Sequence, residues 1–206
     1  MKKTPRRPLV LLLVIAVVSI FISAAVLVFW AIPRQYVTTD IADYGKYKGN
    51  YDNKTVREFI SSFFPDEIES DYSNVTYSYR AQKNDAYAFE AYLSFVIEDE
   101  MQYNAFVEEH TAGLNQQAFR YDAAYWEYVV IDEFDPSSQY ENGIVSIRYA
   151  KIGKILCNPE KQEVIFVAMG VYDGGVAKTD FLCVYFNRFQ IDPKEYALHT
   201  IPAYMK

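Results

Sequence analysis

The chain opens with its longest hydrophobic pattern. Residues 9–32 contain no charged side chain, and only Ser19 and Ser23 interrupt the apolar run. As an α-helix with a rise of about 1.5 Å per residue, this segment would reach roughly 36 Å, whereas the hydrocarbon core of a bilayer is about 30 Å thick. The pattern therefore predicts a transmembrane helix over 9–32. The membrane, contacted through this segment, is the first interaction partner that the sequence predicts.

Charges that flank this segment predict its orientation. Four of the eight residues before it are lysine or arginine, whereas only Arg34 follows it closely. Cytoplasmic flanks of membrane spans carry the excess of basic residues. We therefore expect residues 1–8 to be a short cytoplasmic tail, and the rest of a single-pass cell-membrane protein to be extracytoplasmic.

A cleaved signal peptide is the alternative interpretation. Its apolar core would be residues 9–22, and the small residues 23–25 would form the cleavage site. Signal-peptide cores are usually 7–15 residues long, whereas this apolar run continues to Trp30. The length favours a retained signal anchor.

The pattern changes after the span. Residues 33–53 lack hydrophobic periodicity and are predicted to be a stalk, followed by one domain over 54–206. We expect helices at 55–64, 99–110 and 193–198, and strands at 72–80, 87–98, 125–132, 143–156, 164–172 and 181–189. Because the strands do not alternate with helices, the order predicts an α+β fold. Its mainly antiparallel sheet would be curved and roll-like, with a final four-strand meander, and would pack against the first two helices.

Three of these elements have defined apolar faces. Residues 87–98 alternate, so that Phe89, Leu93 and Phe95 share one face of a strand. The stripe of the first helix comprises Val56, Phe59, Ile60, Phe63 and Phe64, and that of the second comprises Met101, Ala105 and Phe106. These faces predict where the core lies.

Charge restricts the partners of the exported part. All 27 acidic residues follow the span, whereas four of the 20 basic residues precede it, which leaves a net charge of −11 on the rest. Such a surface repels nucleic acid and anionic lipid but suits a cationic partner. We therefore predict no nucleic-acid binding.

The two cysteines give conflicting signals. An even number in an exported domain favours a Cys157–Cys183 disulfide. In the predicted meander, however, residues 164–172 pair with 150–156 on one side and with 180–188 on the other, which separates the two cysteines by roughly 20 Å. A disulfide needs Cα atoms within about 7 Å. The register therefore predicts two free thiols, buried or half-buried.

Candidate chemistry is sparse. His110 and His199 are the only histidines, and neither has a histidine or cysteine at the spacing that zinc sites use. The acid–base candidate is the sequence Glu108-Glu109-His110, but the exposed polar end of an amphipathic helix explains it without such a role. No nucleotide-binding or nucleophile motif occurs. We therefore assign no catalytic, cofactor-binding or metal-binding residue.

Acidic and aromatic clusters have structural explanations. The acidic cluster at 98–100 suits the N-terminus of a helix, and the cluster at 132–135 lies where a predicted strand passes into a loop. The alternative is catalytic, since paired carboxylates can hydrolyse glycosides. Residues 50–54 lack the glycine and the closing glutamate of a calcium loop. The 19 tyrosines could form a platform for glycans or peptides, but tyrosine also favours half-buried sheet faces.

These observations predict a membrane-anchored extracytoplasmic binding domain without catalytic activity, with a protein or glycan partner. The alternatives are a cell-envelope hydrolase that uses unidentified carboxylates and an accessory subunit of a membrane complex. A cleft in which carboxylates or a histidine–carboxylate pair converge would favour the hydrolase. A flat tyrosine-rich face would favour binding.

Overall fold

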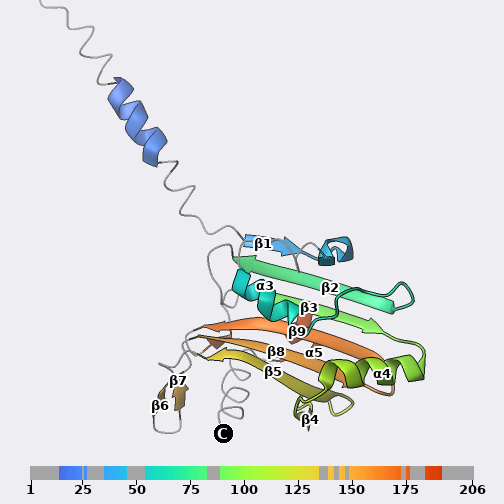
Figure 1. The fold of residues 1–206 in the computed structure, drawn as a ribbon. Coiled ribbons are helices and arrows are strands. Elements are labelled where there is room, and N and C mark those ends of the chain that lie inside the picture. Colours follow the sequence, from blue (N-terminus) through green and yellow to red (C-terminus); the bar gives the residue numbers. More distant parts are fainter. Residues whose placement is uncertain are drawn as a thin grey trace, which may run out of the picture. The chain divides into compact units, whose positions relative to one another are not determined.

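The computed structural model divides the chain into two units, Met1–Arg34 and Gln35–Lys206. It describes residues 14–24, 26, 35–45, 54–82, 89–134, 139–141, 144–146, 149–172, 175–176 and 184–191 (Figure 1). In the first unit, residues 14–24 are helical. Among the described residues, no helix combines the length and the apolar character that crossing a membrane requires.

The second unit is built on one antiparallel sheet in the order β1-β2-β3-β9-β8-β5-β4, with β10 paired to β9. Its strands are β1 (Gln35–Thr38), β2 (Ser73–Gln82), β3 (Phe89–Val96), β4 (Gln116–Ala118), β5 (Trp126–Phe134), β8 (Tyr149–Asn158), β9 (Glu163–Tyr172) and β10 (Gly175–Val176). A separate hairpin joins β6 (Gln139–Glu141) to β7 (Ile144–Ser146). The prediction of an α+β fold with an antiparallel sheet is confirmed.

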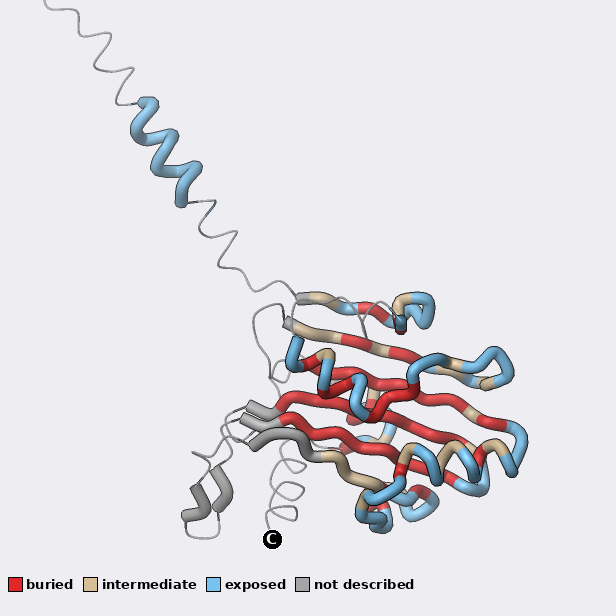
Figure 2. Tube along the Cα trace, in the orientation of Figure 1, coloured by how far each residue is buried: buried red, intermediate tan, exposed pale blue. Residues whose placement is uncertain are grey.

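Helices cover both faces of the sheet. They are η1 (Ile41–Asp43), α3 (Lys54–Ser61), α4 (Glu100–Thr111) and α5 (Val184–Phe189). In Figure 1, α3 and α4 lie in front of the sheet and α5 lies behind it. The sheet is therefore the middle layer, and its central strands β3, β9 and β8 are buried along most of their described length (Figure 2).

The face beneath α3 and α4 carries the larger apolar core. Phe59 of α3 is 2% exposed, and Phe89, Leu93 and Phe95 of β3 are fully buried in the same cluster. The predicted faces of the first helix and of strand 87–98 are thus confirmed. The prediction for the second helix is wrong at Met101 and Ala105, which are exposed. Phe106 lies on the inner side as predicted, together with Tyr103 and Val107.

One close approach in this core requires glycine. A Cβ atom on Gly153 of β8 would lie 2.6 Å from the Phe63 ring. That distance is shorter than van der Waals contact allows, so the bare backbone of Gly153 provides the space in which the ring packs. Phe63, at the end of the apolar stripe of α3, is thereby held directly on the sheet.

The segment after β9 differs from the prediction. A strand was expected at 181–189, but Val184–Phe189 forms helix α5, whose Tyr185 and Phe186 pack on the second face of the sheet. The expected place beside β9 is taken by β3, which pairs with it from Glu90↔Met169 to Val96↔Glu163. The prediction of a four-strand meander is therefore wrong. Only its first three strands, which correspond to β5, β8 and β9, lie side by side in the sheet in the predicted order.

Residues 35–45, within the range expected to be a stalk, contribute to the folded unit. Gln35–Thr38 pairs with β2 as the edge strand β1. Tyr44 is buried, and its hydroxyl donates a hydrogen bond of 2.6 Å to the backbone carbonyl of Pro65. In the sequence, the folded unit thus begins at Gln35, shortly after the predicted membrane segment.

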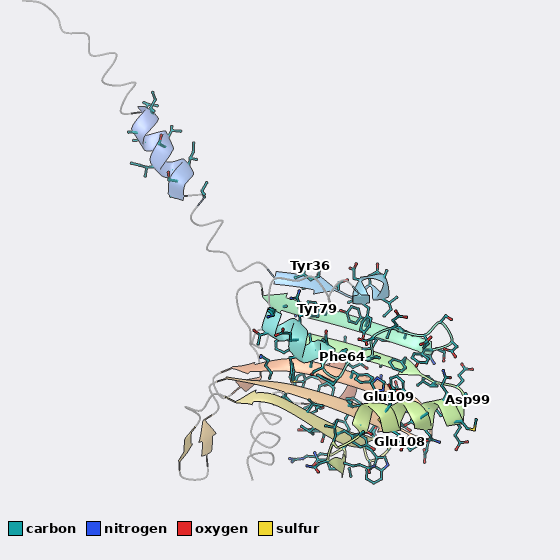
Figure 3. All side chains as sticks on the ribbon, viewed as in Figure 1. Tyr36, Phe64, Tyr79, Asp99, Glu108 and Glu109 are labelled. Carbon is teal, nitrogen blue, oxygen red and sulfur yellow. The ribbon has the colours of Figure 1, made fainter. Side chains whose placement is uncertain are left out.

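The burial of the described tyrosines bears on whether they form a surface platform or pack on sheet faces. Seven of the described tyrosines are buried: Tyr44, Tyr77, Tyr79, Tyr92, Tyr103, Tyr125 and Tyr185. Tyr36 and Tyr79, labelled in Figure 3, lie on neighbouring strands with ring centroids 6.4 Å apart. The described tyrosines act mainly as core side chains.

Candidate functional site

A pocket of about 730 Å³ lies on the α3/α4 side of the sheet. It is lined by residues 61–67 at the end of α3, by Glu69 and Tyr72 before β2, by the C-terminal half of α4, and by Leu114 and Val130. Figure 3 labels two of its lining side chains, Phe64 and Glu109, which come from these two parts of the chain. Ligand sites of small molecules typically have volumes of 300–1,000 Å³.

Local sequence explains why α3 ends at this position. Pro65 has no backbone N–H to continue α3, and the backbone N–H groups of Phe63 and Phe64 both donate to the carbonyl of Ile60, which closes the last turn. The hydrogen bond from Tyr44 then fixes the Pro65 carbonyl. The segment after Pro65 is therefore anchored at its start and exposed at Asp66 and Glu67.

The other wall, α4, is placed by its two ends. Asp99 caps the N-terminus by accepting a hydrogen bond of 2.8 Å from the Gln102 backbone N–H. The helix ends at Thr111, and Gly113 follows with φ of +78°, a left-handed conformation that favours glycine. This confirms the interpretation of the acidic cluster at 98–100 as a helix N-terminus.

Aromatic rings form the inner part of the pocket. Phe64 packs against Phe166 of β9 with centroids 5.4 Å apart, and Phe106 meets the same ring edge-on at 6.1 Å. Tyr72 contacts Phe106 edge-on, with centroids 6.0 Å apart. The pocket therefore rests on side chains that belong to the core and that are fixed by it.

Carboxylates line the outer part. Asp66, Glu67, Glu69 and Glu109 are all exposed and line the pocket. Burial raises the pKa of the Tyr72 phenol, and the nearby carboxylates of Glu69, Asp71 and Glu109 raise it further. Negative potential from both walls therefore converges on Tyr72.

His110 is the only described histidine, and it lines this pocket. Its ring stacks on Phe106, with centroids 3.9 Å apart and an interplanar angle of 18°. Its Nδ1 lies 2.9 Å from the Phe106 carbonyl oxygen. Because a carbonyl can only accept, Nδ1 carries the hydrogen, and in the neutral ring Nε2 is left as an acceptor.

The structure therefore separates the residues of the predicted acid–base candidate. Glu109 and His110 line the pocket, whereas Glu108, labelled beside them in Figure 3, does not. The imidazole Nδ1 donates its hydrogen bond to a backbone carbonyl, not to a carboxylate that would orient the ring for general-base catalysis. The four pocket carboxylates were not grouped by sequence reasoning, because 40 residues separate Glu69 from Glu109.

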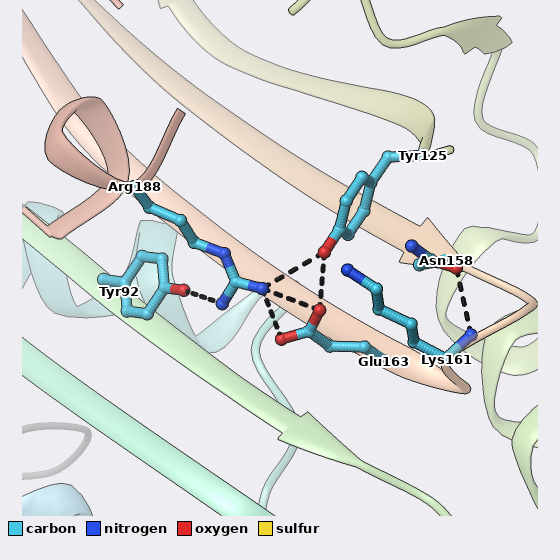
Figure 4. A network of polar contacts seen from close by, with 6 residues as sticks. All are labelled: Tyr92, Tyr125, Asn158, Lys161, Glu163 and Arg188. Carbon is cyan, nitrogen blue, oxygen red and sulfur yellow. Dashed lines mark hydrogen bonds and ion pairs between the residues drawn. The ribbon is translucent and has the colours of Figure 1, made fainter. Parts of the chain in front are cut away.

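A second polar cluster lies on the opposite face of the sheet, where sequence reasoning placed none. Arg188 of α5 donates to both carboxylate oxygens of Glu163, at 2.6 and 2.7 Å, and to the hydroxyl of Tyr92, at 2.9 Å (Figure 4). Tyr125 donates to Glu163 at 2.6 Å, and burial together with this hydrogen bond raises the pKa of Tyr125 to about 12. These contacts hold α5 on the sheet.

A buried ion pair lies on the same face. The ammonium of Lys154 donates to Glu127, and Gln117 donates to the other oxygen of that carboxylate at 2.7 Å. Both charged side chains are at most 5% exposed. Burial lowers the pKa of Lys154, and the Glu127 carboxylate partly offsets this effect. The available signal was the presence of two lysines, Lys151 and Lys154, in the largely apolar sequence of β8.

The remaining candidates do not form a site in the described part of the chain. Those residues contain no group of three or more His, Cys, Asp or Glu side chains that could hold a metal ion. His199, residues 50–53 and the side chains of 132–135 lie outside the described residues.

The cysteine prediction is tested at one position only. Cys157 is free and buried, as predicted, and burial raises the pKa of its thiol to about 12. Cys183 lies outside the described residues, as does the helix predicted at 193–198. The register argument that excluded a disulfide relied on the incorrect strand at 181–189, so two free thiols stay a prediction.

The two polar regions differ in what they can do. On the second face, the charges of Arg188, Glu163, Lys154 and Glu127 are paired within the chain, which is typical of a structural role. The pocket has an aromatic interior and an outer ring of carboxylates, and no lysine or arginine is among the described residues that line it. Comparison with known proteins finds no matching family model, no matching curated protein and no matching solved structure.

Proposed function

We propose that this chain is a single-pass membrane protein whose extracytoplasmic domain binds a ligand in the α3/α4 pocket. The pocket itself carries the proposal. Its volume of about 730 Å³ lies within the range of small-molecule sites, and its lining combines core aromatic rings with carboxylates, a histidine and two serines. Such a lining can contact both the apolar and the polar parts of a ligand.

Anchoring by residues 9–32 is supported by sequence and by local structure. The segment has no charge, and most of its basic flanking residues lie on the N-terminal side. Residues 14–24 are helical, and the large apolar side chains from Val14 to Ile22 are exposed. A helix that is apolar on all sides requires lipid or a protein partner around it.

Binding is better supported than hydrolysis. A hydrolase would need a general base oriented towards a nucleophile or a water molecule. His110 has its Nδ1 engaged by a backbone carbonyl, and the hydroxyl of the nearby Ser62 donates to the Phe59 carbonyl at 2.6 Å. The observation that favours the hydrolase is the presence of a histidine and several carboxylates in one pocket.

Filling the pocket should abolish binding without unfolding the domain. Ala112 is exposed and lines the pocket, so Ala112→Trp places an indole there at little cost to the core. Met101→Trp is the matched control, because Met101 is 81% exposed at the other end of α4 and does not line the pocket. We expect affinity purification from native membranes to lose its specific partners only with Ala112→Trp.

The measurement is quantitative mass spectrometry of material captured by the full chain and by both variants. Equal capture by the wild type and by Ala112→Trp would contradict the assignment of the pocket as the binding site. Equal loss with both tryptophan variants would point to a surface that extends over α4 rather than to the pocket.

A further inference from the structure

Resting on the proposed function, we infer that the pocket ligand is an organic cation, an ammonium or guanidinium group carried on an apolar stem. The chemistry has two sources, a free alkylamine and a basic side chain of a polypeptide. Both present the same group to the pocket, and the experiment below separates them.

The first step is the charge of the pocket entrance. Glu67, Glu69 and Glu109 are exposed, come from two separate parts of the chain, and form no ion pair within the described residues. No described lysine or arginine lines the pocket, although Arg57 and Lys54 lie within the same helix, α3, that leads into it. A bound cation would supply a counter-charge to these three carboxylates, Glu67, Glu69 and Glu109.

The second step is the position at which the negative potential converges. Glu69 precedes β2 and Glu109 lies on α4, yet both carboxylates raise the pKa of the same phenol, Tyr72. A cation next to this hydroxyl would interact favourably with both carboxylates at once. The phenol could accept a hydrogen bond from the cation in the same place.

The third step is the interior beneath these groups. Tyr72 and Phe106 form an edge-to-face pair. One face of Tyr72 stacks on Phe95, with centroids 4.6 Å apart, and one face of Phe106 stacks on His110. Both rings are half-buried, so what is left exposed of them offers an apolar surface to the stem of a ligand. Apolar stems of lysine and arginine pack on such rings while their charged ends stay solvated. A metal cation would gain nothing from this interior, whereas an organic cation would use both parts of the pocket.

Isothermal titration calorimetry can test the inference with the full chain in nanodiscs of zwitterionic lipid. The probes are the peptide acetyl-Lys-Phe-Lys-amide, its uncharged analogue with glutamine and its acidic analogue with glutamate, together with 1,6-diaminohexane. We expect the basic peptide or the diamine to bind, and the other two peptides to bind at least tenfold more weakly. Binding should weaken as ionic strength rises.

Charge-removing variants locate the interaction. The double variant Glu69→Gln/Glu109→Gln removes two pocket charges with little change in shape, and we expect roughly tenfold weaker binding of the cation. Glu108→Gln is the matched control, because Glu108 is adjacent in sequence and exposed but lies outside the pocket. Its effect should stay below about twofold.

Each outcome decides a different point. Tighter binding of the basic peptide identifies a polypeptide source, and equal or tighter binding of the diamine identifies a free amine; both support the inference. Binding of the neutral or acidic peptide as tightly as the basic one, with loss in Ala112→Trp, would overturn the inference and leave the proposed function standing. Cation binding that the double variant does not weaken would also overturn it. Absence of binding by every probe, or probe binding that Ala112→Trp leaves unchanged, would overturn the inference. The capture experiment with Ala112→Trp decides the proposed function separately.

Discussion

Phe59→Ala is expected to destabilise the domain by about 3–5 kcal/mol, which is the usual cost of deleting a buried phenylalanine. Phe59 is 2% exposed in the core beneath α3. Its ring packs against Phe63, with centroids 5.4 Å apart, and edge-on against Phe89 of β3 at 6.2 Å. The alanine would leave a cavity between the helix and the sheet, and domains of this size are stable by only about 5–15 kcal/mol.

Chemical denaturation of the full chain in a fixed neutral detergent measures this loss. Glu58→Ala is the matched control on the same helix. Its ion pair with Lys54 is solvent-exposed, with 3.5 Å between the charged atoms, so its loss should cost no more than about 0.5 kcal/mol. A loss below about 1 kcal/mol for Phe59→Ala would show that α3 does not pack on this core.

Glu127→Gln should have a comparable effect on the opposite face. The substitution keeps the shape of the side chain but leaves the Lys154 ammonium buried without its counter-charge. Removing one partner of a buried ion pair typically costs about 3–5 kcal/mol. The double variant Glu127→Gln/Lys154→Met removes both charges, and it should recover most of the lost free energy of unfolding.

The pH dependence of the stability of Glu127→Gln distinguishes the effect of the lost charge from that of lost packing. Burial lowers the pKa of Lys154, and Glu127→Gln removes the carboxylate that offsets the effect. The folded variant then binds fewer protons than its unfolded state, so its stability should increase from neutral pH towards about 10.4, the ordinary lysine pKa. The double variant should lack this slope. Equal stability of Glu127→Gln and the wild type at pH 7 would contradict the buried ion pair.

Elements with a single clear period could be predicted from the sequence. The alternation over 87–98 corresponds to β3, and the apolar stripe of the first helix corresponds to the buried side of α3. In residues 181–189, apolar side chains occur at both odd and even positions, a pattern that fits either a strand or a short helix. The structure shows that the described part of this segment is the helix α5. Pairing between β3 and β9 joins residues 67 to 79 positions apart, and no local pattern indicates such a contact.

The pocket was predictable only in part. Glu109 and His110 were singled out from their types and their neighbours in the sequence. Asp66, Glu67 and Tyr72 were not, because their place opposite α4 depends on how α3 ends and on the hydrogen bond from Tyr44 to Pro65. The buried charges at Lys154 and Glu163 were missed because a second covered face was not expected.

The central claim is that the pocket is exposed on the extracytoplasmic side of a membrane. Cysteine labelling tests it directly in intact bacterial spheroplasts that express the full chain with Cys183→Ser. Cys157 can be retained, because burial raises the pKa of its thiol to about 12 and thereby suppresses its reactivity. Glu67→Cys places a thiol at the exposed entrance of the pocket, and Lys3→Cys places one before the predicted span.

A membrane-impermeant maleimide should label Glu67→Cys in intact spheroplasts. Lys3→Cys should react only after the membrane is permeabilised, because residues 1–8 are predicted to be cytoplasmic. The account predicts this pair of results in the membrane fraction, with the labelled chain retained at its full mass. Labelling of Glu67→Cys only after permeabilisation, or its recovery in the soluble fraction as a chain shortened near residue 25, would contradict the membrane-anchored extracytoplasmic assignment.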